Sequence, residues 1–131
     1  KRPVLIHDAV RPFPPVGPIL EALRAVEQGG GALLTEPSTD TLKRVDAQAR
    51  VLETLPRAYI VRAQTPQVAR LEDWVRAFEA ADAFGWEATD DVGLLEAIGM
   101  AVVAIPSTPT NVKLTTPADW DRYHPGTTPV V

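Results

Sequence analysis

An aspartate and an arginine stand three residues apart, directly after the first apolar run of the chain. The run covers residues 4–6 (VLI), and Asp8 and Arg11 follow it in the segment HDAVRP. A carboxylate can bind a hydroxyl or a metal ion, and a guanidinium can bind a phosphate through two parallel hydrogen bonds. A capped turn with a local Asp–Arg pair explains the same residues equally well, because both types are common in loops.

Three further polar segments fall where strands are expected to end or helices to begin. They are residues 64–67 (QTPQ), 89–91 (TDD) and 111–115 (NVKLT). Ligands of open α/β sheets bind outside the carboxyl ends of the strands. Together with Asp8 and Arg11, these segments could therefore form a rim that binds an anionic ligand.

Each of these segments also has a purely structural explanation. Lys113 lies between two apolar residues and can be an exposed strand lysine, since lysine is usually solvated. Thr65 precedes a proline and can be a turn residue. Asp90 and Asp91 precede an apolar helical pattern, where capping and the helix dipole favour acidic side chains.

Several kinds of site are excluded by residue type. The chain has no cysteine, which excludes disulfides and zinc–thiolate centres. Its two histidines, His7 and His124, match no metal-ligand spacing, and His7 is expected to be packed or hydrogen-bonded at the end of its strand. The three tryptophans are interpreted as packing residues. The chemistry that remains is positioning and electrostatic stabilisation of phosphate charge.

Length and composition indicate one globular domain. The chain has 131 residues, of which 45% are hydrophobic and 23% charged. A net charge of −4 without clustered Lys or Arg argues against a nucleic-acid-binding surface. No apolar stretch approaches the ~20 residues of a membrane span, and no signal peptide opens the chain. We therefore expect a cytoplasmic protein, and the abrupt start into a strand suggests a boundary within a longer sequence.

Hydrophobic periodicity predicts strands that alternate with helices. Strands are expected at residues 4–6, 32–34, 59–61 and 101–105, and helices at 17–28, 70–83, 92–98 and from 116 onward. Gly29, Gly30 and Gly31 are expected to end the first helix. This alternation is typical of a layered α/β fold with a mostly parallel, mixed sheet. The tail at residues 125–131 is expected to fray.

Residues 37–58 show a different pattern. Two short runs of partial alternation, at 41–45 and 50–54, flank a polar link, which predicts a β-hairpin. The hairpin is more polar than the other strands, so we expect it to protrude as an arm rather than to join the sheet.

The five segments HDAVRP, DTLKR (residues 40–44), QTPQ, TDD and NVKLT occur in this order along the chain. This series resembles the later half of the 2-C-methyl-D-erythritol 4-phosphate cytidylyltransferase family, over about residues 4–123. The resemblance implies that residues 1–131 are the later half of a single Rossmann-like nucleotidyltransferase domain. It also implies that the arm at about 37–58 interlocks two subunits of a homodimer.

The resemblance also implies roles for individual residues. Asp8 and Arg11 match the methylerythritol-phosphate site, and Thr65 matches a threonine that contacts the substrate. Lys113 matches a lysine near the reacting α-phosphate, so Lys113 and Asp8 are the catalytic candidates. Thr41 and Arg57, both within the predicted arm, match arm residues that reach the substrate in the partner subunit.

The implied reaction joins CTP and methylerythritol phosphate, with release of pyrophosphate. Mg²⁺ is expected as cofactor, bound mainly through the CTP phosphates, and no metal-binding residue is assigned to this chain. The family's N-terminal glycine-rich loop, which binds the triphosphate, has no counterpart in residues 1–131, so we expect this chain alone to be inactive. Two alternatives stay open: a cytidylyltransferase for ribitol 5-phosphate or another polyol phosphate, and a non-catalytic dimerisation domain.

Overall fold

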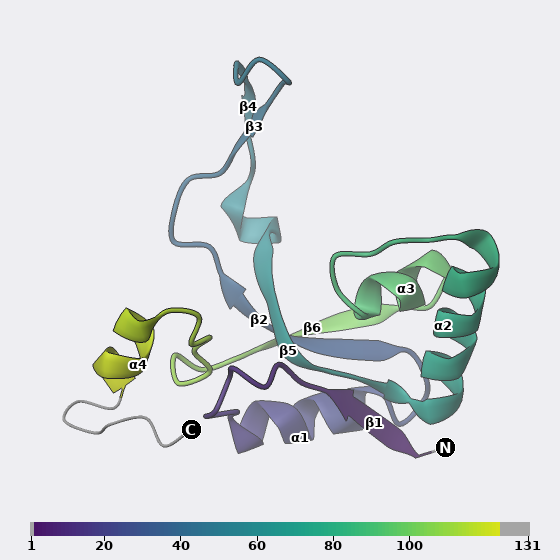
Figure 1. Ribbon diagram of the computed structural model, residues 1–131. Helices are drawn as coiled ribbons and strands as arrows, with labels where there is room; N and C mark the ends of the chain where they lie inside the picture. The colour runs from purple at the N-terminus through teal and green to yellow at the C-terminus, as the bar shows by residue number, and fades with distance from the viewer. Residues whose placement is uncertain (1, 124–131) are drawn as a thin grey trace.

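The computed structural model describes residues 2–123, so His124 and the tail at 125–131 lie outside the described residues. Figure 1 shows a central sheet with helices on both faces and a hairpin that projects away from it. In chain order, the elements are β1 (Pro3–Ile6), α1 (Val16–Ala25), β2 (Gly31–Pro37), β3 (Lys43–Val45), β4 (Val51–Thr54), the 3-10 helix η1 (Arg57–Tyr59), β5 (Val61–Arg70), α2 (Leu71–Phe84), α3 (Val92–Ala97), β6 (Val102–Pro106) and α4 (Pro117–Tyr123). None of the helices in this part of the chain is long and apolar enough to cross a membrane.

The main sheet is mixed, as predicted, with the strand order β1-β5-β2-β6. The pair β2–β6 is parallel, whereas β5 runs antiparallel to both β1 and β2. The parallel share is therefore smaller than the sequence predicts. The reason is the connection from β2 to β5, which passes through the hairpin arm instead of a crossover helix and so returns the chain in the opposite direction.

Two apolar clusters cover the two faces of this sheet. Helix α1 packs on one face through Ala22, together with its C-cap residue Val26, against Leu34 and Val68 among others. Helices α2 and α3 pack on the other face around Trp74, Leu95 and Ala69, which comes from β5. Val68 and Ala69 are neighbours in one strand and point to opposite faces, so β5 carries apolar residues on both sides.

The tryptophans expected to pack do so to different degrees. Trp74 is 3% exposed, and its indole N–H donates to the Val4 carbonyl at 2.9 Å. Trp86 is 37% exposed and stacks on Phe84 with ring centroids 5.3 Å apart. Trp120 is half-buried. The packing interpretation thus fits Trp74 best, since its ring is buried and its polar atom has a partner.

The first helix ends earlier than predicted. Its last residue is Ala25, and Val26 forms the C-cap, so the glycines do not cap it directly. Gly29 and Gly30 instead have positive φ angles of 99° and 82° and form the turn into β2, where Gly31 is the first residue. Helices α2 and α3 lie within one residue of their predicted bounds, and Gly99 follows α3 with a φ of 83°.

The longest strand is β5, and its position corrects two expectations. Tyr59 belongs to the 3-10 helix and not to a strand, and the QTPQ segment lies inside β5 instead of following a strand. The pairing of β2 with β5 shifts register between Leu33, opposite Gln67, and Thr35, opposite Ala63. Pro66 lies in this bulge, where its missing N–H does not interrupt the regular hydrogen bonds between the two strands. The bulge also disturbs the alternation of side chains between the two faces of β5.

The predicted hairpin arm is confirmed. Strands β3 and β4 form a separate two-stranded sheet, joined by a cross-strand ion pair in which Arg44 Nε lies 2.8 Å from Glu53 Oε1. The turn is organised by Asp46, whose carboxylate accepts hydrogen bonds from the backbone N–H groups of Gln48 and Arg50. The hydrogen bond from the Arg50 N–H is the main reason why the pKa of Asp46 lies below its usual value.

The last helix begins where the sequence predicts. Asp119 Oδ2 accepts hydrogen bonds from the N–H groups of Thr115 and Thr116, and the Thr116 hydroxyl accepts one from the Asp119 N–H. This reciprocal arrangement fixes the start of α4 and, chiefly through the Thr115 N–H, lowers the pKa of Asp119. The preceding segment, residues 111–115, runs beside the loop after β1 without forming a strand, through a hydrogen bond from the Leu114 N–H to the Val10 carbonyl.

The turn before β2 provides a test of the fold. The Gly31 N–H donates to the Ala101 carbonyl, and this close approach would place a Cβ on Gly30 only 2.7 Å from that oxygen. A Cβ on Gly29 would meet nothing within 4 Å, although its φ is also positive. Gly30→Ala should therefore lower the free energy of unfolding by about 1–3 kcal/mol more than Gly29→Ala, as measured by urea denaturation. Equal losses in the two variants would contradict this packing.

Candidate functional site

The loop after β1 holds Asp8 and Arg11 as an ion pair. The Arg11 N–H donates to the Asp8 carbonyl, and Arg11 Nε donates to Asp8 Oδ2 at 3.0 Å. The side chain of Arg11 is 10% exposed and that of Asp8 36%. The local pair considered from sequence is therefore present. It also fixes the guanidinium in a nearly buried position, from which Arg11 Nη1 donates to the carbonyl of Asn111.

The bulge in β5 brings Thr65 to the same loop. The Thr65 hydroxyl accepts a hydrogen bond from the Asp8 N–H at 2.9 Å and lies 3.0 Å from His7 Nδ1. His7 Nε2 lies 2.8 Å from the Arg11 carbonyl. A neutral His7 protonated on Nε2 satisfies both contacts, because Nδ1 then accepts the proton of the Thr65 hydroxyl. The expectation that His7 is hydrogen-bonded at its strand end is confirmed.

Asn111 is a site residue that sequence reasoning did not single out. It is 2% exposed, and its side-chain amide donates both protons, one to Gln64 Oε1 and one to the Thr65 carbonyl, each at 2.9 Å. Its backbone carbonyl accepts the hydrogen bond from Arg11. Asn111 thus joins three segments that are far apart in sequence. Its place directly before Val112 and Lys113 was visible in the sequence, but its partners depend on the fold.

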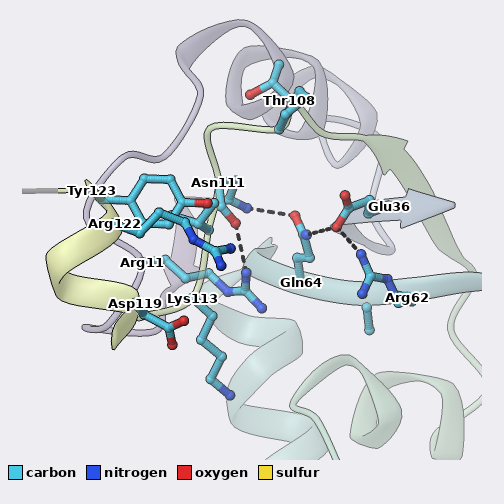
Figure 2. Close-up of a pocket in the computed structure, with 13 residues that line it drawn as sticks. Arg11, Glu36, Arg62, Gln64, Thr108, Asn111, Lys113, Asp119, Arg122 and Tyr123 are labelled. Atoms are coloured by element: carbon cyan, nitrogen blue, oxygen red, sulfur yellow. Dashed lines mark hydrogen bonds and ion pairs between the residues drawn. The ribbon is translucent and has the colours of Figure 1, made fainter. Parts of the chain in front are cut away.

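A row of hydrogen bonds continues from Asn111 to the base of the arm (Figure 2). Gln64 Nε2 donates to Glu36 Oε2 at 2.9 Å, and Arg62 Nη2 donates to the same oxygen at 2.6 Å. Glu36 and Arg62 are paired across β2 and β5. The row therefore connects the strands that lead into and out of the arm with the loop that carries Arg11.

The two aspartates before α3 differ in their contacts. The side chain of Asp90 has hydrogen-bond partners in the protein, whereas that of Asp91 has none among residues 2–123. Asp90 Oδ1 accepts the Gly93 N–H, and Asp90 Oδ2 accepts Gln67 Nε2. Gln67 is 2% exposed and also accepts the Val92 N–H on its Oε1. Asp91 occupies the N-cap position without a capping side-chain hydrogen bond. The capping explanation thus holds for Asp90 and fails for the carboxylate of Asp91.

These side chains surround two adjoining cavities. The smaller, of about 270 Å³, is lined by Asp8, Arg11, Ala63, Gln64, Thr65, Gln67, Thr89, Asp90, Asp91 and Lys113. The larger, of about 610 Å³, lies between the base of the arm and α4; its lining shares Arg11, Ala63, Gln64 and Lys113 and adds Arg62, Arg122 and Tyr123, among others (Figure 2). The rim predicted from Asp8, Arg11, Thr65 and Lys113 is therefore present as the lining of one cavity.

Two of the predicted site residues lie elsewhere. Thr41 is exposed in the segment leading to β3, and neither Thr41 nor Arg57 lines these cavities. Arg57 Nη1 donates to the Thr39 carbonyl at 2.8 Å, at the base of the arm. Within one chain the structure does not bring them to the other four residues, so any shared site would need a second subunit.

The charges around the smaller cavity suit a ligand that carries both an anionic group and hydroxyls. Lys113 has no hydrogen-bond or ion-pair partner among residues 2–123, and its side chain extends away from the row that begins at Asn111 (Figure 2). Asp8 and Asp91 supply carboxylate oxygens on the same cavity. A lysine ammonium binds phosphate as a compact charge, and carboxylates accept hydrogen bonds from hydroxyls.

The role of Asn111 can be tested by removing its amide. Asn111→Ala leaves Gln64 Oε1 and the buried Thr65 carbonyl without this donor, so the free energy of unfolding should fall by about 1–3 kcal/mol. Gln48→Ala, on the exposed turn of the arm, should change it by less than about 0.5 kcal/mol. Urea denaturation measures both. Similar small effects in the two variants would show that Asn111 does not hold the site together.

The environment of Asp91 predicts a pH-dependent stability difference. Burial, followed by the charges of Asp90 and Asp8, raises the pKa of Asp91 above its ordinary value. A raised folded-state pKa means that ionisation of Asp91 opposes folding once the pH passes the unfolded value of about 3.9. Asp91→Asn should therefore be more stable than the wild type in urea denaturation at pH 7 and equally stable near pH 3. Lower stability at pH 7 would contradict the assigned environment.

Comparison with known proteins gives one consistent result. A sequence model described as 2-C-methyl-D-erythritol 4-phosphate cytidylyltransferase matches residues 1–123. The enzyme of that name from Acidobacterium capsulatum is 44% identical over 119 residues, which cover 88% of this chain and 50% of that protein. The bifunctional enzyme IspD/IspF of Anaeromyxobacter dehalogenans is 43% identical over 122 residues, covering 91% of this chain and 32% of that protein.

Solved structures agree with the sequence relatives. The 4-diphosphocytidyl-2C-methyl-D-erythritol synthase from Anaerococcus prevotii superposes with a TM-score of 0.83 at 30% identity, over 91% of this chain and 55% of that one. The 2-C-methyl-D-erythritol 4-phosphate cytidylyltransferase from Thermus thermophilus superposes with a TM-score of 0.77 at 33% identity, over 89% of this chain and 57% of that one. The chain spans about half the length of the single-function curated relatives that it matches. The chain therefore belongs to the 2-C-methyl-D-erythritol 4-phosphate cytidylyltransferase family.

Proposed function

We propose that the protein acts as a cytidylyltransferase that joins CTP to 2-C-methyl-D-erythritol 4-phosphate and releases pyrophosphate, in the non-mevalonate route to isoprenoids. The observation that carries this proposal is the convergence of Asp8, Arg11, Thr65 and Lys113 on one cavity, in a chain that belongs to this family. The size of the cavity, about 270 Å³, suits a small polyol phosphate.

The residues divide into those that bind the polyol and one that acts on phosphate charge. Asp8 accepts hydrogen bonds from substrate hydroxyls, and Arg11 and Thr65 hold Asp8 in position through the contacts described above. Lys113, whose ammonium group has no partner in the described part of the chain, stabilises the charge that spreads over the reacting phosphates. The phosphate oxygen of the polyol attacks the α-phosphorus of CTP, and the bond from that phosphorus to the pyrophosphate breaks.

The nucleotide and its metal ion are parts of the same proposal. Since the relatives are about twice as long as the matched region, we assign most of the CTP site to residues that this chain does not span. Mg²⁺ is part of this proposal as an ion carried mainly by the triphosphate, since substrate phosphates are its usual ligands in nucleotide-dependent enzymes. When bound, it supplies charge neutralisation of the phosphates.

The arm supports a homodimer. Val45, Val51, Leu52 and Val61 are half or nearly half exposed, and Tyr59 at the base is 89% exposed. An isolated two-stranded hairpin is marginally stable in water, and a row of exposed apolar side chains on it is typical of an interface. We propose that a second subunit covers this surface and that Thr41 and Arg57 reach its site. A cytoplasmic location completes the proposal.

The reaction is tested by measuring pyrophosphate release on the complete gene product, with CTP and each polyol phosphate in turn. Methylerythritol phosphate should support turnover, and ribitol 5-phosphate should not. Lys113→Ala should lower kcat by roughly 10²–10³, the size of losing one donor to a transition-state charge. Arg24→Ala, on the exposed surface of α1, serves as a control and should leave kcat unchanged. Normal turnover by Lys113→Ala would overturn the assignment of this lysine.

The arm is tested by mixing two inactive variants. Arg57→Ala removes the arm residue from one subunit, and Asp8→Ala removes the carboxylate from the other. Each heterodimer then contains one intact site and one site that lacks both residues. Random mixing makes about half of the dimers heterodimers, so about a quarter of all sites are intact. Pyrophosphate release should therefore recover to about a quarter of the wild-type rate. A fully active monomer in sedimentation analysis, or no recovery after confirmed subunit exchange, would contradict action across the interface.

A further inference from the structure

The carboxylate of Asp91 is the acidic group of the smaller cavity that no protein contact explains. Asp8 is bound to Arg11, and Asp90 accepts hydrogen bonds from Gly93 and Gln67. The side chain of Asp91 makes no hydrogen bond or ion pair within residues 2–123; its backbone carbonyl alone accepts one, from Leu94.

Helix α3 does not need this carboxylate. The first N–H groups of the helix already have partners: the Val92 N–H donates to Gln67 Oε1 at 2.9 Å, and the Gly93 N–H donates to Asp90 Oδ1 at 3.1 Å. An uncharged residue at position 91 would leave these hydrogen bonds intact. The negative charge therefore contributes nothing visible to the start of the helix.

The surroundings of Asp91 also oppose its charge. Burial and the neighbouring carboxylates of Asp90 and Asp8 raise its pKa. Two cations line the same cavity: Arg11 is paired with Asp8, and Lys113 is not paired with Asp91. A charge held in an unfavourable place without a protein partner is typical of a functional group, because the protein itself gains no stability from it.

Lys113 and Asp91 together define what can bind between them. An anionic group satisfies the lysine, and a hydroxyl donor satisfies the aspartate. We propose that Asp91 accepts a hydrogen bond from a hydroxyl on the carbon chain of the polyol phosphate and so selects hydroxylated substrates. This inference rests on the proposed function and adds a specificity-determining residue to it. A site built to bind a hydroxyl rejects an analogue that lacks it, because the bound analogue desolvates the acceptor and leaves it unpaired.

Three variants of the complete gene product test the proposal. Asp91→Asn keeps the size of the side chain and removes its charge, and Asp91→Ala removes the acceptor. Asp90→Asn is the matched control, because Asp90 lines the same cavity but is occupied by Gly93 and Gln67. Methylerythritol phosphate and a set of analogues, each with one hydroxyl replaced by hydrogen, serve as substrates. Pyrophosphate release gives kcat and KM, and calorimetry gives the affinity for the same compounds and for inorganic phosphate.

Asp91→Asn should lower kcat/KM for methylerythritol phosphate by about 10- to 100-fold, the range expected for a hydrogen bond to a charged group, with an unchanged KM for CTP. One analogue of the set lacks the hydroxyl that Asp91 recognises. For that analogue, the wild type and Asp91→Asn should have equal kcat/KM. Asp91→Ala should behave in the same way, and affinity for inorganic phosphate should not change. Asp90→Asn should reduce activity toward all substrates by one common factor.

The outcomes separate this inference from the proposed function. Wild-type kcat/KM in Asp91→Asn, or one common loss across all analogues, would overturn the role of Asp91 while the reaction stands. If polyol phosphates bind in a way that depends on Asp91 but no pyrophosphate is released from CTP, the role of Asp91 is supported and the proposed reaction is overturned. Failure of the wild type to bind any polyol phosphate would overturn both. Misfolding does not confuse these results, because Asp91→Asn is expected to be the more stable protein at pH 7.

Discussion

The buried amide of Asn111 fixes the relative positions of three segments on which the candidate site depends. Its side chain holds the bulge of β5 through Gln64 and Thr65, and its backbone holds Arg11 in the loop after β1. Both protons of this buried amide are used, so displacing the side chain would leave buried polar groups unpaired. The segment that follows Asn111 carries Lys113, so the same residue anchors the lysine next to the Asp8–Arg11 pair.

The polar groups of the site fall into two physical classes. One class is satisfied within the chain: the Asp8–Arg11 pair, the Thr65 hydroxyl, and Gln67 with Asp90. These contacts give the cavity a defined shape. The other class, Lys113 and Asp91, faces the same cavity without partners in the described chain. A rigid lining with a few unsatisfied charges is what a preorganised binding site requires, because the ligand then supplies the missing contacts.

Much of this organisation could be predicted from the sequence, and the remainder could not for identifiable reasons. The apolar run before Asp8 predicted a strand that ends at polar residues of the candidate site, and the change of pattern at residues 37–58 predicted the arm. The position of Thr65 was misjudged, because a proline in a strand suggests a loop unless the bulge around it is known. Asn111 and Gln67 were missed as structural centres, since the partners that show their roles lie between 23 and 100 residues away in sequence.

We propose that a small polyol phosphate binds between Lys113 and the two carboxylates of Asp8 and Asp91, which line one cavity. The most direct test is a crystal structure of the complete gene product with 2-C-methyl-D-erythritol 4-phosphate bound. The phosphate should lie within hydrogen-bond distance of Lys113 Nζ, and substrate hydroxyls should donate to the carboxylates of Asp8 and Asp91. A phosphate bound away from Lys113, or hydroxyls that contact neither carboxylate, would contradict this proposal.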